Sequence, residues 1–195
     1  MAITNGYSTL AEFKAFNDID STDAENDAVL EQVIESVSRY IDAETQMFFY
    51  ASDAATKVYT PTMSDMLQVD PLRVVTTLKT DDGGDGTYEN TWATTDYHLM
   101  PLNGSVFHWI QLKSAGDYTF PVGILAGVQI VGNFGYAAVP ADIKIICMEI
   151  SKNVNGRRSG QGTEAVEITA AGVMITPKDI GPYARKVLNQ YRRPR

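Results

Sequence analysis

A change in the spacing of the apolar residues constrains the fold of this chain more than any other feature. Between residues 24 and 46, large apolar residues recur every three or four positions, which is the period of one face of an α-helix. These residues are Val29, Leu30, Val33, Ile34, Val37, Tyr40 and Ile41. Between residues 57 and 135, short β-type runs separated by turn residues replace this pattern. The sequence therefore predicts a long helix followed by a block of strands.

Capping signals predict two further helices, over residues 8–17 and 139–155. Thr9 and Glu12 have the spacing of a capping box, in which each side chain bonds the backbone N–H of the other residue. Pro140 suits the first position of the later helix, where its missing N–H costs nothing, and Gly156 is a plausible stop. The expected apolar stripe of the later helix consists of Ile143, Ile146, Cys147, Ile150 and Val154.

The β block contains six runs with strand character. They are Lys57–Thr60, Met66–Val69, Arg73–Thr80, Tyr97–Met100, Trp109–Lys113 and Val128–Phe134. The acidic segment 81–86 is typical of a hairpin turn, because its glycines permit positive φ and its aspartates cap turns. Because these strands are segregated between helices, the pattern indicates an α+β fold: a bundle of about four helices with an antiparallel β region inserted between the second and third.

The remaining sequence suggests how the chain is divided. We expect a core domain over residues 1–156, which contains the inserted β region 57–135, and then a flexible glycine-containing linker over 157–175. A last helix with a basic tail is expected over 176–195. Its start is predicted at Thr176-Pro177-Lys178-Asp179, which combines a capping residue, a proline and an acidic third position.

Charge is unevenly distributed along the chain. Residues 1–100 hold 5 basic and 18 acidic residues, whereas residues 101–195 hold 11 basic and 6 acidic ones. A molecule polarised in this way is suited to join a second copy or an acidic partner at its basic end, because complementary potentials orient docking. The overall excess of acid argues against general DNA binding.

Few residues carry recognisable chemistry. Cys147 lies among isoleucines and is expected to be a buried thiol, and the two histidines, His98 and His108, do not form a zinc pattern. The acidic turn Asp81–Asp85 lacks the order of an EF-hand, so a solvated turn is favoured over a calcium site. We expect no catalytic residue, no metal and no cofactor. Neither a signal peptide nor a membrane span is indicated, which predicts synthesis in the cytoplasm.

Taken in order, several segments of the chain resemble the gp6-like head-tail connector proteins of long-tailed phages. The early segments are Ser8–Lys14, Ser38–Asp42, Phe48–Tyr50, Val58-Tyr59 and Val69–Leu72. The later ones are Val128–Tyr136 followed by Val139-Pro140, similar to the family's G-x-x-G-Y-x-x-V-P region, and the helix that ends at Gly156-Arg157-Arg158. No single segment is diagnostic, and the long β region and the acidic Asp81–Asp85 turn depart from the family pattern.

The resemblance implies a structural adaptor protein of the virion, without catalysis, at the head-tail junction of a phage and made in the host cytoplasm. About a dozen copies would form a homo-oligomeric ring under the portal protein. The C-terminal segment would reach toward the portal, and the opposite face would receive the next neck or tail protein. Genomic DNA would pass through the ring without sequence-specific binding. Separately from the resemblance, the acidic excess of residues 1–100 suggests that acidic side chains line the channel and repel the DNA phosphates.

The residues predicted to contact the portal all lie in the last helix and tail. They are Ile180, Tyr183, Arg185, Lys186, Leu188, Tyr191, Arg192, Arg193 and Arg195. The apolar side of this helix is expected to find its burial on another protein, while its arginines pair with carboxylates of the partner.

Two other functions fit the sequence. One is a different neck or tail completion protein, such as a tail terminator, which would share ring assembly and attach elsewhere. The other is a small ligand-binding module or enzyme with a site in the β region around Tyr97, His98, His108 and Trp109.

Overall fold

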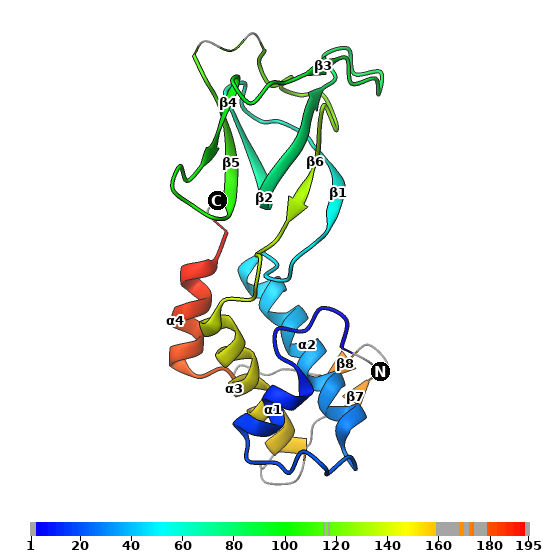
Figure 1. The fold of residues 1–195 in the computed structure, drawn as a ribbon, viewed down its shortest axis with the longest axis vertical. Helices are drawn as coiled ribbons and strands as arrows, with labels where there is room; N and C mark the ends of the chain where they lie inside the picture. Colours follow the sequence, from blue (N-terminus) through cyan, green and yellow to red (C-terminus); the bar gives the residue numbers. More distant parts are fainter. Residues whose placement is uncertain are drawn as a thin grey trace. The chain divides into compact units, whose positions relative to one another are not determined.

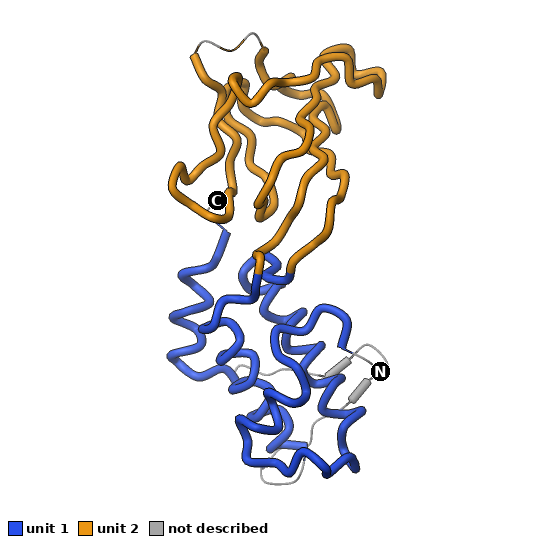
Figure 2. Tube along the Cα trace, in the orientation of Figure 1, with its two compact units in different colours: residues 1–50, 138–195 blue, residues 51–137 orange. Residues whose placement is uncertain are grey.

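The chain folds into two compact units (Figure 2). The computed structural model describes residues 3–114, 116, 118–158, 168–169, 172–173 and 179–193. Residues 1–50 and 138–195 form the helical unit, and residues 51–137 form the sheet unit. The helical unit is therefore built from both ends of the chain, and the sheet unit is the segment between them.

The helical unit contains α1 (Leu10–Phe16), α2 (Asp27–Thr45), α3 (Ala141–Arg158) and α4 (Pro182–Tyr191) (Figure 1). A small hairpin, β7 (Ile168–Thr169) and β8 (Gly172–Val173), also belongs to it. The predicted capping box is confirmed, because Glu12 N donates to Thr9 Oγ1 and Thr9 N donates to Glu12 Oε2. The four predicted helices are confirmed, with shifted ends.

Hydrogen bonds account for two of the shifted ends. The long helix begins at Asp27 rather than residue 24, because the preceding aspartates form turns of their own: Asp20 accepts the N–H of Thr22, and Asp23 accepts that of Glu25. The third helix begins after Pro140 and continues through Gly156 to Arg158, so the predicted stop at Gly156 is wrong. Arg158 holds this last turn by bonding the side chains of Asn155 and Asn26.

The core of the helical unit lies between α2 and α3. The predicted stripe of α3 is confirmed, because Ile143, Ile146, Cys147, Ile150 and Val154 are almost completely buried. On α2 it is confirmed for Leu30, Val33, Ile34, Val37 and Ile41, whereas Val29 and Tyr40 at its edges are only partly buried. Apolar burial of this kind contributes roughly 2 kcal/mol per large side chain.

Tyr7 ties the start of the chain into this core. Its backbone N–H donates to Ser38 Oγ over 3.0 Å, its hydroxyl donates to Asp42, and Phe49 N donates to the same hydroxyl over 2.9 Å. Its ring meets the Phe49 ring edge to face. One buried aromatic residue thus joins the N-terminal segment to α2 and to the segment that follows it.

The sheet unit contains β1 (Ala54–Tyr59), β2 (Met66–Thr80), β3 (Asn90–Thr91), β4 (Tyr97–Met100), β5 (Phe107–Leu112) and β6 (Val128–Phe134). The order is β1-β6-β2-β5-β4, with β3 paired to the end of β2, and all pairs are antiparallel. The α+β class with an antiparallel sheet between the second and third helices of the sequence is confirmed.

One strand was predicted as two. Met66–Val69 and Arg73–Thr80 belong to the single strand β2, which continues through Pro71. The strand changes partner at this point: β5 pairs with the part up to Leu72, and β6 pairs from Leu72 onward, with register shifts on both sides. A proline and a bulge are tolerated where a strand passes from one partner to the next.

Gly132 marks a close approach of two strands. A Cβ at this position would lie 2.2 Å from the backbone carbonyl oxygen of Val74 on β2. Gly135 follows β6 with φ of 75°, and its N–H donates to Pro71 O over 2.7 Å. The predicted strand Val128–Phe134 is therefore confirmed, it ends in a tight turn at Gly135, and packing requires a glycine at position 132.

We predict that Gly132→Ala destabilises the sheet unit by about 2–3 kcal/mol, because the added methyl group forces β6 away from β2. Gly156→Ala, in α3 where an added Cβ would meet nothing within 4 Å, is the matched control; it should stabilise the helical unit by about 0.5–1 kcal/mol and leave the sheet unit unchanged. Both tryptophans lie in the sheet unit, so denaturant unfolding followed by tryptophan fluorescence measures the change there. Equal midpoints for Gly132→Ala and the wild type would contradict the packing argument.

The carboxyl group of Asp42 predicts a pH dependence. Burial raises its pKa from the ordinary 3.8 to about 6, a direction that Glu35 reinforces and that the Tyr7 hydrogen bond and Arg39 oppose. The native state therefore holds this proton more tightly than the unfolded state. The stabilisation it provides is complete below about pH 4 and is lost as the pH rises through 6.

We expect Asp42→Asn, which keeps the oxygen that accepts the Tyr7 hydroxyl, to gain stability relative to the wild type as the pH rises from 4 to 7. Denaturant unfolding followed by circular dichroism at 222 nm measures the difference. Asp20→Asn is the control, because the backbone N–H of Thr22 lowers the pKa of Asp20, so its titration is largely complete at pH 4 and the variant should change little relative to the wild type between pH 4 and 7. If Asp42→Asn changes with pH no more than Asp20→Asn does, the assignment to Asp42 is wrong.

Candidate partner interface

The last helix is anchored to α3 at its start by a buried ion pair. The Asp179 side chain is 2% exposed, and its Oδ2 lies 2.5 Å from Nη2 of Arg157. The backbone carbonyl of Asp179 also accepts Nδ2 of Asn153 over 2.8 Å. Gly181 then takes the N-cap position and Pro182 the first turn, so the helix starts later than the predicted cap. Thr176, Pro177 and Lys178 of that cap lie outside the described residues.

The end of α4 is anchored as well. The Tyr191 hydroxyl donates to Asp142 Oδ1 over 3.0 Å, and its ring meets the Phe49 ring edge to face at 5.3 Å. Arg193 N donates to Thr45 O over 2.9 Å. Because Asp142 lies at the start of α3 and Arg157 at its end, α4 runs antiparallel to α3.

Between these anchors, the apolar side of α4 is buried in its own unit. Ile180, Ala184, Val187 and Leu188 are each at most 9% exposed. The expectation that this side finds its burial only on another protein is wrong for Ile180 and Leu188, because α2 and α3 already cover them. Amphipathic spacing predicts that a face is covered, and it does not identify the surface that covers it.

The other side of α4 faces outward. Tyr183 is 59% exposed, and Arg185, Lys186 and Arg192 are also exposed, whereas Tyr191 and Arg193 are partly buried. Arg195 lies outside the described residues. The structure thus divides the predicted interface residues into an anchoring set and an outward set, and we name Tyr183, Arg185, Lys186 and Arg192 the basic face of α4. Whether a partner binds this face stays a prediction.

The two halves of the sequence differ strongly in their balance of acidic and basic residues, but the two units do not differ in the same way. The helical unit combines residues 1–50, with 2 basic and 10 acidic residues, and residues 138–195, with 10 basic and 5 acidic residues. An ion pair joins these two segments: Lys144 Nζ lies 2.7 Å from Glu12 Oε1, and this hydrogen bond lowers the pKa of Glu12. Part of the basic character of the C-terminal segment is therefore used within the fold.

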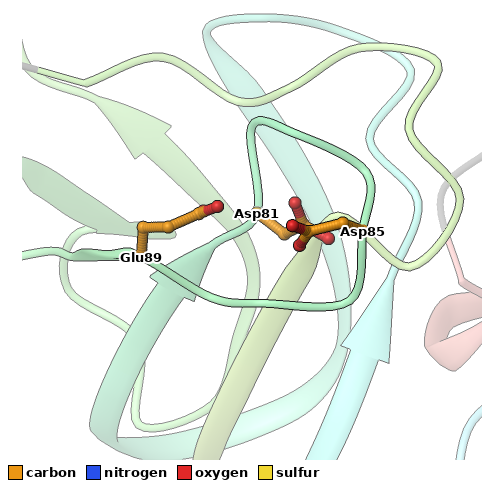
Figure 3. A group of neighbouring side chains, drawn as sticks. All are labelled: Asp81, Asp85 and Glu89. Carbon is orange, nitrogen blue, oxygen red and sulfur yellow. The ribbon is translucent and has the colours of Figure 1, made fainter.

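The acidic turn after β2 is held by its own carboxylate. Both oxygens of buried Asp81 accept backbone N–H groups, from Gly84 over 2.6 Å and from Gly86 over 2.8 Å. Figure 3 shows Asp85 and Glu89 beside Asp81, and their oxygen atoms lie within 4.8 Å of one another. The predicted hairpin turn is confirmed, and the Asp81 carboxylate stabilises it by accepting these two backbone N–H groups.

The residues of the alternative β-region site do not face a common point. In the β4–β5 pair, His98 is opposite Gln111 and Met100 is opposite Trp109, which places His98 and Trp109 on one face of the sheet. By the same alternation, Tyr97 and His108 lie on the other face. This divides the set that the sequence suggested.

The predicted buried thiol of Cys147 is confirmed. Cys147 is buried between α2 and α3 next to Ser38, and burial raises the pKa of its thiol to about 11. A thiol of this kind packs as a small apolar group.

Among the described residues, none of the helices has the length and apolar character needed to span a membrane.

Neither a protein-family model nor a curated protein sequence matches this chain. Solved structures do match its fold over its entire length. A chain in the neck of the empty gene transfer agent particle, computed with C6 symmetry, superposes with a TM-score of 0.57 at 16% identity, covering 100% of this chain and 94% of that one. A chain in the neck of the native particle, computed with C12 symmetry, gives 0.57 at 18% identity, with 100% and 93% covered.

A chain from the virion of the native gene transfer agent particle gives a TM-score of 0.55 at 16% identity, with 100% and 94% covered. At these identities the likeness establishes a shared fold. It extends over both units, so the combination of helical unit and inserted sheet unit is common to all of these chains.

We predict that Asp179→Ala destabilises the protein by about 3 kcal/mol, because it leaves the buried guanidinium of Arg157 without its carboxylate. Hydrogen exchange should show α4 amides that are protected in the wild type and exchange faster in this variant. Arg192→Ala, at an exposed position of the same segment, is the control and should change the free energy of unfolding by less than about 0.5 kcal/mol. Equal stabilities for the two variants would show that the ion pair does not anchor α4.

Proposed function

We propose that this chain is a structural head-to-tail connector subunit of a phage or phage-like particle. In this proposal about a dozen copies assemble into a ring below the portal protein, extend the DNA channel and present a surface to the next neck or tail protein. Its place is the head-tail junction of the virion, and it is made in the host cytoplasm. The gp6-like connector family is the family we propose for it.

The observation that carries this proposal is the likeness in fold to chains of gene transfer agent necks over the whole length of the protein. Those necks were computed with C6 and C12 symmetry, as expected for rings of repeated subunits. The sequence segments that resemble gp6-like connectors occur in both units, which supports the same conclusion independently.

The basic face of α4 is the surface that we assign to the portal. It presents one exposed aromatic ring with the basic residues Arg185, Lys186 and Arg192, a combination that suits an acidic protein surface. The anchors at both ends of α4 hold this face in place before any partner arrives. Ile180, Leu188 and Tyr191 then support the face from behind, and Arg193 and Arg195 continue the basic character toward the chain end.

A structural role also agrees with the chemistry of the described residues. The two histidines point to opposite faces of the sheet, the thiol is buried, and Asp81 holds its own turn. For the channel, we propose that acidic residues of the sheet unit, which has 9 acidic and 4 basic residues, keep DNA from adhering as it passes.

Binding to the portal protein of the same particle tests the proposal. The full chain should form a cyclic oligomer with portal, seen by native mass spectrometry and electron microscopy. Lys186→Glu should weaken portal binding about tenfold or more, because it places like charges against each other. Lys152→Glu, at another exposed lysine on α3, is the matched control and should bind as the wild type does.

Circular dichroism establishes that both variants fold. Binding of the wild type to tail-tube protein instead of portal would indicate a terminator-like function rather than a connector function. A chain that binds neither protein and stays monomeric would refute the proposal altogether.

A further inference from the structure

The sheet unit presents an apolar tip to solvent. The loop between β5 and β6 includes the sequence Pro121-Val122-Gly123-Ile124-Leu125-Ala126-Gly127, which contains no charged residue. Leu125 is 86% exposed and Val122 is 53% exposed. Large apolar side chains that project together from a soluble protein are typical of a binding surface.

Hydrogen bonds keep this tip in place. Ala126 N donates to Thr60 Oγ1 over 2.9 Å, and Ala126 O accepts the Tyr88 hydroxyl over 2.8 Å. Gly127 O accepts Asp81 N over 2.9 Å. The tip is thus tied to the strand ends beside it and to the acidic turn, so Leu125 cannot fold back onto its own core without breaking these bonds.

The same unit contains a hollow of about 440 Å³ between β2 and β4. Its apolar lining includes Val74, Leu99, Leu102 and Phe107, and Leu102 is 64% exposed. Arg73 is the charged residue among those that line it. The hollow has the size and character of sites that accept a few apolar groups.

The tip cannot fill the hollow of its own copy. Val74 lies six residues before Thr80 on β2, roughly 20 Å along the strand, and Thr80 pairs with Val128 next to the tip. The tip extends beyond that end of the strand. The apolar tip and the apolar hollow therefore lie at separate places on one unit, and within the described part of the chain neither covers the other.

The charges beside them are complementary. Asp82, Asp85 and Glu89 are exposed on the turn that is hydrogen-bonded to the tip, and the positively charged Arg73 lines the hollow. A ring with cyclic symmetry needs two different, complementary surfaces on each copy. A second copy of the chain is therefore the occupant that fits both the shape and the charge.

We propose that Leu125 and Val122 of one copy insert into the Val74–Leu102 hollow of the next copy, with the acidic turn beside Arg73, and that this contact repeats around the ring. The inference rests on the proposed ring and names the surfaces that close it. A contact between two unlike surfaces, repeated from copy to copy, closes into a ring when the rotation allows it.

Cysteine cross-linking in the full chain tests the contact directly. Leu125→Cys and Leu102→Cys lie at exposed positions, and the native Cys147 is buried. A short bis-maleimide should join a tagged Leu125→Cys chain to an untagged Leu102→Cys chain. The double variant should give a ladder of covalent oligomers. Val58→Cys, at a 51% exposed position of β1, is the matched control and should cross-link to Leu125→Cys at least tenfold less.

A charge exchange gives a second readout. Leu125→Asp should reduce the amount of ring at least tenfold without changing the unfolding midpoint, and Leu102→Lys in the same chain should restore it. Rings and portal binding that persist without a Leu125–Leu102 cross-link, and in Leu125→Asp, would overturn the contact and leave the connector function intact. A cross-link in a chain that binds no portal would support the contact and refute the function. Absence of cross-link, ring and portal binding together would overturn both.

Discussion

The packing of α2 against α3 is the interaction on which the rest of the structure depends. These two helices bury complementary apolar stripes, yet more than ninety residues of chain separate them. Bringing them together costs loop-closure entropy, but that cost rises only slowly with loop length. The intervening segment forms a sheet with its own core, so the helical unit tolerates it as an insertion. The N-terminal segment, α1 and α4 then have a common support.

Local signals in the sequence were sufficient for most elements. The capping box at Thr9, the α2 and α3 stripes and the strands Tyr97–Met100 and Val128–Phe134 were predicted correctly, because each depends on spacing within a few residues. The errors occurred where a distant partner decides the outcome. β2 passes through Pro71 because β5 and β6 share it, and α3 passes Gly156 because Asn26 helps to hold its last turn.

The candidate interface shows the same division. That α4 has one apolar and one basic side is visible in its spacing. The sequence does not reveal that the apolar side is already covered, because the contacts that dock α4 join residues far apart in the chain. These contacts are Arg157 with Asp179, and Asp142 with Tyr191. A buried charge paired with a distant one leaves no local pattern. The exposure of the tip at Leu125 is also not visible in the sequence, since a short apolar run usually indicates a core segment.

An anchored α4 changes the energetics expected of docking. A helix that orders only on its partner loses conformational entropy at that moment, at a cost of several kcal/mol. Here the Asp179 and Tyr191 anchors have already ordered it, so contacts of the basic face contribute to affinity without that cost. Binding through exposed basic residues should then be fast, steered by charge and sensitive to salt. These are suitable properties for the connector subunit that we propose, because every copy presents the same rigid surface before it meets a partner.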